Sequence, residues 1–145
     1  IGIDIGGTGI KGAIVDVKNG VLIGERVRYE TPEGGHPQDI AVVVAKIVRD
    51  LKPSRATLPV GVCFPAVVQH GRTMSAANVS KEWIGLDADG LFESTLQRHV
   101  HVLNDADAAG VAAVLAVVGL CAVVERIGFI QVSGDTGVQT RITML

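Results

Sequence analysis

The N-terminal stretch IGIDIGGTGIK has the composition of a phosphate-binding loop. An alternating apolar run leads into Asp4, Gly6 and Gly7 follow, and Thr8 and Lys11 lie just beyond. Glycines after a strand let backbone N–H groups close around an anion, while the carboxylate of Asp4 can hold a metal ion or its water. The alternative is a glycine-rich hairpin turn that binds nothing. The pattern differs from the P-loop GxxxxGK[ST], because a second strand rather than a helix is expected after it.

The segment LNDADAAG places an amide and carboxylates where a strand is expected to end and a helix to begin. Helix N-terminal N–H groups favour the ionised form of an acid, so Asp105 is suited to accept a hydroxyl proton during phosphoryl transfer. Asn104 beside it can orient the substrate by hydrogen bonds. The alternative is that Asn104, Asp105 and Asp107 only cap the helix and fill its first turn. For Asp107 this structural role is the prediction.

The segment AANVSKEWIG contains an amide, Asn78, and the only tryptophan of the chain, Trp83. Carbohydrate sites use amides to bind hydroxyl groups and aromatic faces to cover C–H surfaces. The alternative is that Trp83 fills the core. His99 and His101 alternate at the start of a predicted strand, which indicates either a metal-binding pair or, without a third ligand, a solvated strand edge.

These segments fall at the ends of predicted strands and helices. The periodicity predicts strands at 1–5, 11–17 and 21–29, and the last two are joined by a tight turn at Asn19-Gly20. A helix over 40–51 capped by Asp39, a buried strand at 58–64 and a hairpin at 67–74 around His70-Gly71 are expected next. They are followed by a helix at 88–97, a strand at 100–104, a helix from Asp105 and two β-like runs near the C-terminal end.

The composition limits the domain count and the partners. The 145 residues, 48% of them hydrophobic, are enough to bury one core, so a single domain is expected. A formal net charge of -2 gives no electrostatic footprint for nucleic acid or an acidic membrane surface, and this favours small-molecule partners. Cys63 and Cys121 lack CxxC spacing, so neither a disulfide framework nor a zinc site is predicted, and a reducing cytoplasm is the expected location.

The segment 108–124, AAGVAAVLAVVGLCAVV, carries no charge. A buried helix that runs into a turn at Gly119 is predicted, and a membrane span is the alternative, because the segment is close to the minimum length that crosses a bilayer. It would leave more apolar surface than a monomer usually shows, so association into a homo-oligomer is expected.

Four motifs together resemble one protein family. DIGGTGIK, GVCFPAVV, AANVSKEWIG and VLNDADAAG, in this order and spacing, resemble the ROK group of sugar kinases and repressors within the actin-like, ribonuclease-H-like ATPase superfamily. The resemblance covers residues 1–112, and NVSKEWIG narrows it to the bacterial polyphosphate glucokinases. It implies an α/β fold, an actin-like lobe of order βββαβαβα in which helices pack on a mixed sheet.

The resemblance also implies a reaction and roles for single residues. The reaction is transfer of a phosphoryl group from polyphosphate or ATP to the 6-hydroxyl of glucose, with Mg2+ as counter-ion. Asp105 would be the general base, and Asp4 would lie at the metal. The other implied site residues are Asn78, Asn104, Pro65 and Ala66 for the sugar, and Gly6, Gly7, Thr8 and Lys11 for phosphate.

Residues 113–145 depart from the family pattern. The counterpart of a second phosphate loop is Thr136-Gly137, but Asp135 and Gln139 replace flanking glycines, and an acid there would repel a phosphate. The family's kinases also carry a second lobe with an EFGH-like glutamate and histidine. We therefore expect residues 1–145 to be a single N-terminal lobe without the C-terminal one. The alternative to the sugar kinase is a truncated, non-catalytic ROK-like lobe that binds sugar weakly or serves as an interaction domain.

Overall fold

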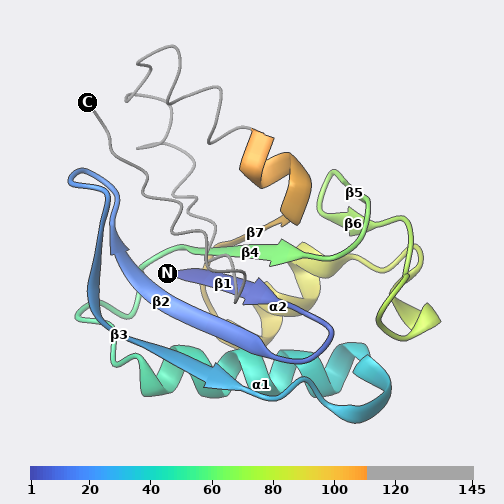
Figure 1. Ribbon diagram of the computed structural model, residues 1–145, viewed down its shortest axis with the longest axis horizontal. Helices are drawn as coiled ribbons and strands as arrows, with labels where there is room; N and C mark the ends of the chain where they lie inside the picture. The colour runs from blue at the N-terminus through green and yellow to red at the C-terminus, as the bar shows by residue number, and fades with distance from the viewer. Residues whose placement is uncertain (111–145) are drawn as a thin grey trace.

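The computed structural model describes residues 1–110, which form a five-stranded mixed sheet (Figure 1). Its strands are β1 (Gly2–Ile5), β2 (Ile10–Asp16), β3 (Val21–Tyr29), β4 (Val60–Phe64) and β7 (Val100–Asn104). The order across the sheet is β3-β2-β1-β4-β7, with β1, β4 and β7 parallel and the β1-β2 and β2-β3 pairs antiparallel. The carboxyl ends of the parallel strands meet at one edge, which is where open α/β sheets bind ligands. The predicted mixed sheet is confirmed.

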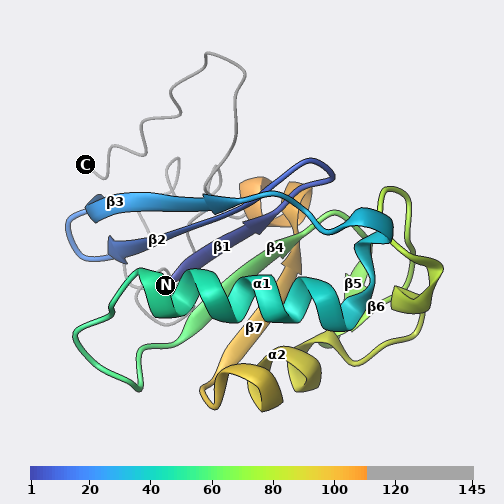
Figure 2. The ribbon, with the colours of Figure 1, turned by 90° about the horizontal axis from the view of Figure 1, so that it is seen from below.

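Two helices, α1 (Pro37–Asp50) and α2 (Ala88–Leu96), pack beside each other on one face of the sheet (Figure 2). The prediction that Asp39 caps the first helix is wrong, because the N-cap is His36 and the helix begins at Pro37. Proline suits the first helical position, since its φ is fixed and it has no N–H to satisfy. Asp39 lies in the first turn, where its charge still favours the helix N-terminus.

The hydrophobic core lies between the sheet and these helices. Its largest fully buried side chains are Trp83, Phe64, Phe92, Ile3, Ile5, Ile10, Ile40, Ile47, Val44, Val60, Val62 and Val100. The strand β4 is buried along its whole length and ends before Pro65, as predicted. At Gly12 on β2, an added Cβ would overlap Ile47 of α1. The missing side chain therefore lets α1 pack directly on the sheet.

Trp83 belongs to this core. It ends the short 3-10 helix η2 (Lys81–Trp83) and is 0% exposed. Its ring centroid lies 4.3 Å from that of Phe64 and 6.0 Å from that of Phe92, and its Nε1 donates a hydrogen bond to Gly35 O at 2.9 Å. The alternative in which Trp83 presents a face to a sugar is excluded, because no face of the ring is accessible.

The turn of the β5-β6 hairpin agrees with the prediction, whereas the turn of the β2-β3 hairpin is longer than predicted. The hairpin of β5 (Val68–Gln69) and β6 (Arg72–Thr73) turns at His70 and Gly71, as expected, with φ of 51° and 74°. The turn between β2 and β3 is longer than predicted: it covers 17–20, and only Gly20 has a positive φ. The carboxylate of Asp16 accepts bonds from the N–H groups of residues 18 and 19, which stabilises the longer turn.

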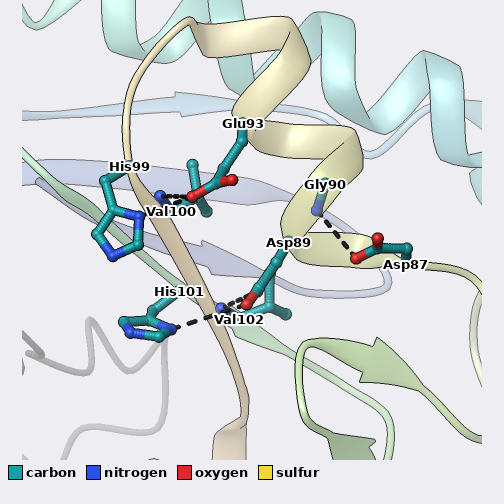
Figure 3. A network of polar contacts seen from close by, with 8 residues as sticks. All are labelled: Asp87, Asp89, Gly90, Glu93, His99, Val100, His101 and Val102. Carbon is teal, nitrogen blue, oxygen red and sulfur yellow. Dashed lines mark hydrogen bonds and ion pairs between the residues drawn. The ribbon is translucent and has the colours of Figure 1, made fainter.

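Two carboxylates of α2 cover the outer edge of β7 (Figure 3). Glu93 accepts a hydrogen bond from Val100 N at 3.1 Å, and Asp89 accepts one from Val102 N at 2.8 Å. Because β7 is an edge strand, these outward N–H groups have no neighbouring strand to bond. The side chains of α2 therefore take the place of a further strand.

The same carboxylates lie beside the histidine pair (Figure 3). Nδ1 of His99 is 2.7 Å from Glu93 Oε1, and Nδ1 of His101 is 3.8 Å from Asp89 Oδ2. Both imidazoles are exposed, and their ring centroids are 5.1 Å apart. Within residues 1–110, no group of three or more His, Cys, Asp or Glu side chains is arranged to hold a metal ion. The solvated strand edge is the interpretation that the structure supports.

Several predictions fall on residues 111–145, outside the described part of the chain. They are most of the apolar segment 108–124, Cys121, the pair Thr136 and Gly137, and the two C-terminal β-like runs. The helix predicted from Asp105 is present over residues 105–110. In the part of the chain that the structure covers, no helix is both long enough and apolar enough to cross a membrane.

Candidate functional site

The glycine-rich segment forms the turn of the β1-β2 hairpin. Gly6 N donates a hydrogen bond to Gly9 O at 3.0 Å, so Gly7 and Thr8 occupy the tip, where both are exposed. Within residues 1–110, the backbone N–H groups of Gly7 and Thr8 donate to no protein acceptor. Neither Gly6, Gly7 nor Gly9 has a positive φ. Backbone conformation therefore does not explain the glycines of this turn. Two adjacent N–H groups without an acceptor in residues 1–110 are the arrangement that an anion could use.

Neighbouring segments hold this turn in place. Thr31 Oγ1 donates a hydrogen bond to Gly6 O at 2.5 Å, from the segment that follows β3. A Cβ added at Gly7 would lie 3.7 Å from Cβ of Asn78. The fold therefore places Asn78, which is exposed, beside the predicted phosphate loop, although the two are far apart in the chain.

Asp4 lies in a row of side chains that crosses the sheet. It pairs laterally with Lys11 on β2 and with Cys63 on β4. Laterally paired residues point to the same side of a sheet, and side chains alternate along each strand. Because Ile3 and Ile5 are buried in the core, the Asp4 row faces the side away from α1.

Burial and charge perturb two groups of this row. Burial raises the pKa of Asp4; the positive charge of Lys11 opposes the shift, and the negative charge of Asp105 adds to it. Burial, together with the charges of Asp4 and Asp105, raises the pKa of the Cys63 thiol to about 12. Cys63 is a free, buried cysteine, and at neutral pH its thiol is protonated. The charge of Asp105 thus acts on Asp4, although the two residues come from opposite ends of the described chain.

Asn104 and Asp105 follow β7 at the same edge of the sheet. The side-chain oxygen of Asn104 accepts bonds from Ala106 N at 2.9 Å and Asp107 N at 3.1 Å, which caps the helix that follows. Its amide nitrogen donates to Ala66 O at 2.8 Å. An asparagine amide has two N–H donors, so one remains for a ligand. Asn104 therefore caps the helix, as the alternative predicted, and one N–H of its amide still has no acceptor among the described residues.

The bond from Asn104 also fixes the end of β4. Ala66 is buried and Pro65 is half-buried, and both follow directly after this strand. Because Phe64 and Asn104 are lateral partners on neighbouring parallel strands, the Pro65-Ala66 backbone and Asp105 leave the sheet side by side. Asp107 is exposed in the first turn of the helix.

The structure brings together most of the predicted site within residues 1–110. Gly6, Gly7, Thr8, Lys11 and Asp4 come from the β1-β2 hairpin; Asn78 lies next to that turn; and Pro65, Ala66, Asn104 and Asp105 come from the ends of β4 and β7. Thr136 and Gly137 lie outside the described residues.

The sequence reasoning missed two residues at this site. One is Thr31, whose hydroxyl bonds the phosphate loop. The other is Arg28 on β3, the lateral partner of Lys11, whose guanidinium occupies the space that a Cβ at Gly9 would take, 2.9 Å from Nε. The sequence did indicate the face on which Arg28 lies. Val27 and Tyr29 point toward the core, so Arg28 between them points to the opposite face of the sheet.

The residues present fit a magnesium ion. Asp4 supplies carboxylate oxygens, and the negative charge of Asp105, which raises the pKa of Asp4, adds to the field that would attract a cation. Mg2+ is commonly bound by one or two carboxylates, with phosphate oxygens and water completing its shell.

Comparison with known proteins places the chain. A sequence profile described as the ROK family matches residues 1–139. The chain belongs to the ROK family. A polyphosphate glucokinase of Mycobacterium tuberculosis (strain ATCC 25177 / H37Ra) is 46% identical over 112 residues, which are 77% of this chain and 41% of the relative. The chain thus spans about two fifths of the length of this curated relative.

Solved structures agree with this assignment. The inorganic polyphosphate/ATP-glucomannokinase of Arthrobacter sp. strain KM matches with a TM-score of 0.72 and 53% identity, over 75% of this chain and 45% of that chain. A ROK family glucokinase of Streptomyces griseus, solved with glucose and AMPPNP, matches with a TM-score of 0.65 and 25% identity, over 77% and 34%. These neighbours have the actin-like, ribonuclease-H-like ATPase fold, so the predicted fold class and the resemblance are confirmed.

Proposed function

We propose that this chain forms the sugar- and phosphate-binding lobe of a kinase that transfers a phosphoryl group from polyphosphate or ATP to the 6-hydroxyl of glucose. The observation that carries the proposal is that the β1-β2 turn and Asp105 lie at the same edge of the sheet, where the charge of Asp105 acts on Asp4. Backbone N–H groups for an anion and a carboxylate that can accept a proton are two of the parts that phosphoryl transfer to an alcohol uses. The relatives named polyphosphate glucokinase support glucose as acceptor and polyphosphate as a donor.

In this proposal Asp105 accepts the proton of the glucose hydroxyl as the oxygen attacks phosphorus. Its place in the first turn of the helix that follows β7 puts the carboxylate at the same edge of the sheet as the sugar-binding residues. Asn104 orients the sugar through its remaining amide N–H, Asn78 binds a further hydroxyl, and the Pro65-Ala66 backbone lines the pocket. Because the transition state of such transfers is loose, positioning supplies most of the rate.

The phosphate side of the site is the β1-β2 turn. The N–H groups of Gly7 and Thr8 bind phosphate oxygens, and Lys11 adds a positive charge. Asp4, with Asp105 nearby, would hold Mg2+, which supplies neutralisation of the charge on the donor oxygens. A cytoplasmic location belongs to this proposal, and the free, buried Cys63 is consistent with it.

The test is glucose 6-phosphate formation by the chain with ATP and with polyphosphate, in a coupled assay, in which one lobe alone is expected to show little turnover. Asp105→Asn is expected to lower turnover at least about a hundredfold, because a general base contributes about 10²–10⁴ in rate. The matched control is Asp107→Asn, an exposed carboxylate in the same helical turn, which should keep turnover within about twofold. No turnover above the Asp105→Asn control would overturn the proposal and favour the alternative, a ROK-like lobe that binds sugar or a partner without catalysis.

A further inference from the structure

Arg28 lies against Gly9, at the end of the phosphate turn that leads into β2. Its guanidinium fills the place of the missing Gly9 side chain, with Nε and Nη2 both 2.9 Å and Cζ 3.2 Å from the position of an added Cβ. Gly9 is buried, and Arg28 itself is exposed. Backbone conformation does not call for glycine at position 9, since its φ is not positive, but a Cβ there would push the guanidinium out of this position.

The register of the sheet places Arg28 in line with the phosphate-binding residues. Asp4 pairs with Lys11, and Lys11 pairs with Arg28, so one lateral row runs from the metal side of the site outward to β3. Val27 and Tyr29 pack on the core, which leaves Arg28 on the opposite face, the face of Asp4 and Lys11. The sugar side, at the ends of β4 and β7, lies at the other end of this row.

Neither cation of the row forms a close ion pair within the described chain, although the charge of Lys11 acts on its lateral partner Asp4. No carboxylate among residues 1–110 forms an ion pair with Lys11 or Arg28. The chain as a whole carries a net charge of -2, so it offers no general attraction to a polyanion. Attraction of a phosphate chain beyond the reach of the turn N–H groups and of a metal ion at Asp4 therefore depends on local cations such as these. Arginine is the better matched to phosphate, because its planar donors can bind two oxygens.

We propose that Arg28 is a donor-binding residue, which contacts phosphates beyond the reacting one on the side of the turn away from the sugar, so that the site accepts an extended inorganic polyphosphate chain. The inference rests on the proposed function, because it takes Asp105 as the acceptor end of the site. Gly9 also has a role in this proposal, because the absence of a side chain there leaves room for the guanidinium beside the turn. Lys11 and Arg28 then bind successive parts of one phosphate chain that starts at Gly7 and Thr8.

The test is titration of the chain with orthophosphate, tripolyphosphate and a long polyphosphate, followed by calorimetry. Arg28→Gln is expected to weaken binding of the long polyphosphate about tenfold, the loss of one charge-assisted contact, and to change orthophosphate binding less than about twofold. Arg26→Gln is the matched control, because Arg26 is an exposed arginine of the same strand that lies two residues away. It should weaken binding less than about twofold.

A second variant, Gly9→Ala, tests the position of the guanidinium without removing its charge. In Gly9→Ala the new Cβ would displace the guanidinium, so polyphosphate binding should fall as in Arg28→Gln, and the double variant should be no weaker than either single one. Equal losses in Arg26→Gln and Arg28→Gln, an unchanged Arg28→Gln, or no polyphosphate binding by the parent chain would each overturn the inference. Failure of the proposed function has a different signature: polyphosphate binds in an Arg28-dependent way, but no glucose 6-phosphate forms.

Discussion

Replacement of Trp83 by phenylalanine separates the two interpretations of the only tryptophan. The substitution keeps an aromatic ring between Phe64 and Phe92 but removes the bond from Nε1 to Gly35 O, at 2.9 Å. That bond is worth about 1 kcal/mol. Gly35 O still accepts from Ser80 N at 3.3 Å, so no unsatisfied acceptor adds to the cost.

The smaller ring in Trp83→Phe also leaves a gap in a fully buried cluster. Loss of contact with the two flanking rings costs about a further 1–2 kcal/mol. The sum, about 2–3 kcal/mol, lowers Tm by roughly 6–10 °C for a chain of this length. Circular dichroism measures this shift without relying on tryptophan fluorescence, which the variant lacks.

Glucose binding by the same variant completes the test. Trp83→Phe should leave the dissociation constant for glucose within about twofold, because the ring is 0% exposed. The contrasting variant is Asn78→Ala at the exposed neighbour of Gly7, which should weaken glucose binding while leaving Tm unchanged. An unchanged Tm in Trp83→Phe together with weakened glucose binding would refute the reasoning, since a core residue cannot behave in that way.

Two further predictions follow from the perturbed groups. Because burial raises the pKa of Asp4, the carboxyl favours folding while it is protonated, and this contribution is lost as pH rises from the ordinary value of 3.8 through the folded-state value. Asp4→Asn should therefore raise Tm at pH 7 but not below pH 3.8, and it should abolish Mg2+-dependent phosphate binding; a lower Tm at pH 7 would contradict this. Burial also raises the pKa of Cys63 to about 12, so iodoacetamide at about pH 8 should modify Cys63 only after unfolding in urea, as read by peptide mass spectrometry; labelling of the folded chain would be the opposite result.

The sequence was sufficient to predict the strand ends that carry the site. Asp4, Pro65 and Asn104 each lie at the end of an apolar run, and parallel strands bring such ends to one edge. The candidate site residues could also be predicted, because amides, carboxylates and glycines are conspicuous in a chain that is 48% hydrophobic. Trp83 could not be assigned to the core from the sequence, since its burial depends on Phe64 and Phe92 from distant segments.

The place of Arg28 could not be predicted, because it depends on an irregularity in pairing. Counting outward from the pair of Asp16 and Val21 would set Lys11 opposite Arg26. The register shifts between Gly12 and Ile14, and Lys11 pairs with Arg28 instead. Bulges of this kind respond to local twist and packing, which a strand pattern does not encode.

The N-terminal end of α1 shows a second limit. Asp39 satisfies the composition rule for a cap, but Pro37 can begin a helix three residues earlier than a cap at Asp39 would allow, and it does so with a histidine at the N-cap. Both arrangements agree with capping preferences, and the choice depends on how His36 and the preceding turn pack. The site does not depend on this difference, because it lies at the strand ends.

The most direct measurement of the central claim is phosphorus NMR of glucose and polyphosphate incubated with Mg2+ and the chain. The account predicts a growing resonance of glucose 6-phosphate that is absent with Asp105→Asn and present with Asp107→Asn. This readout distinguishes transfer to the sugar from transfer to water. Release of orthophosphate alone, or the same spectrum for the chain and for Asp105→Asn, would contradict the assignment of this edge of the sheet as a site of phosphoryl transfer to glucose.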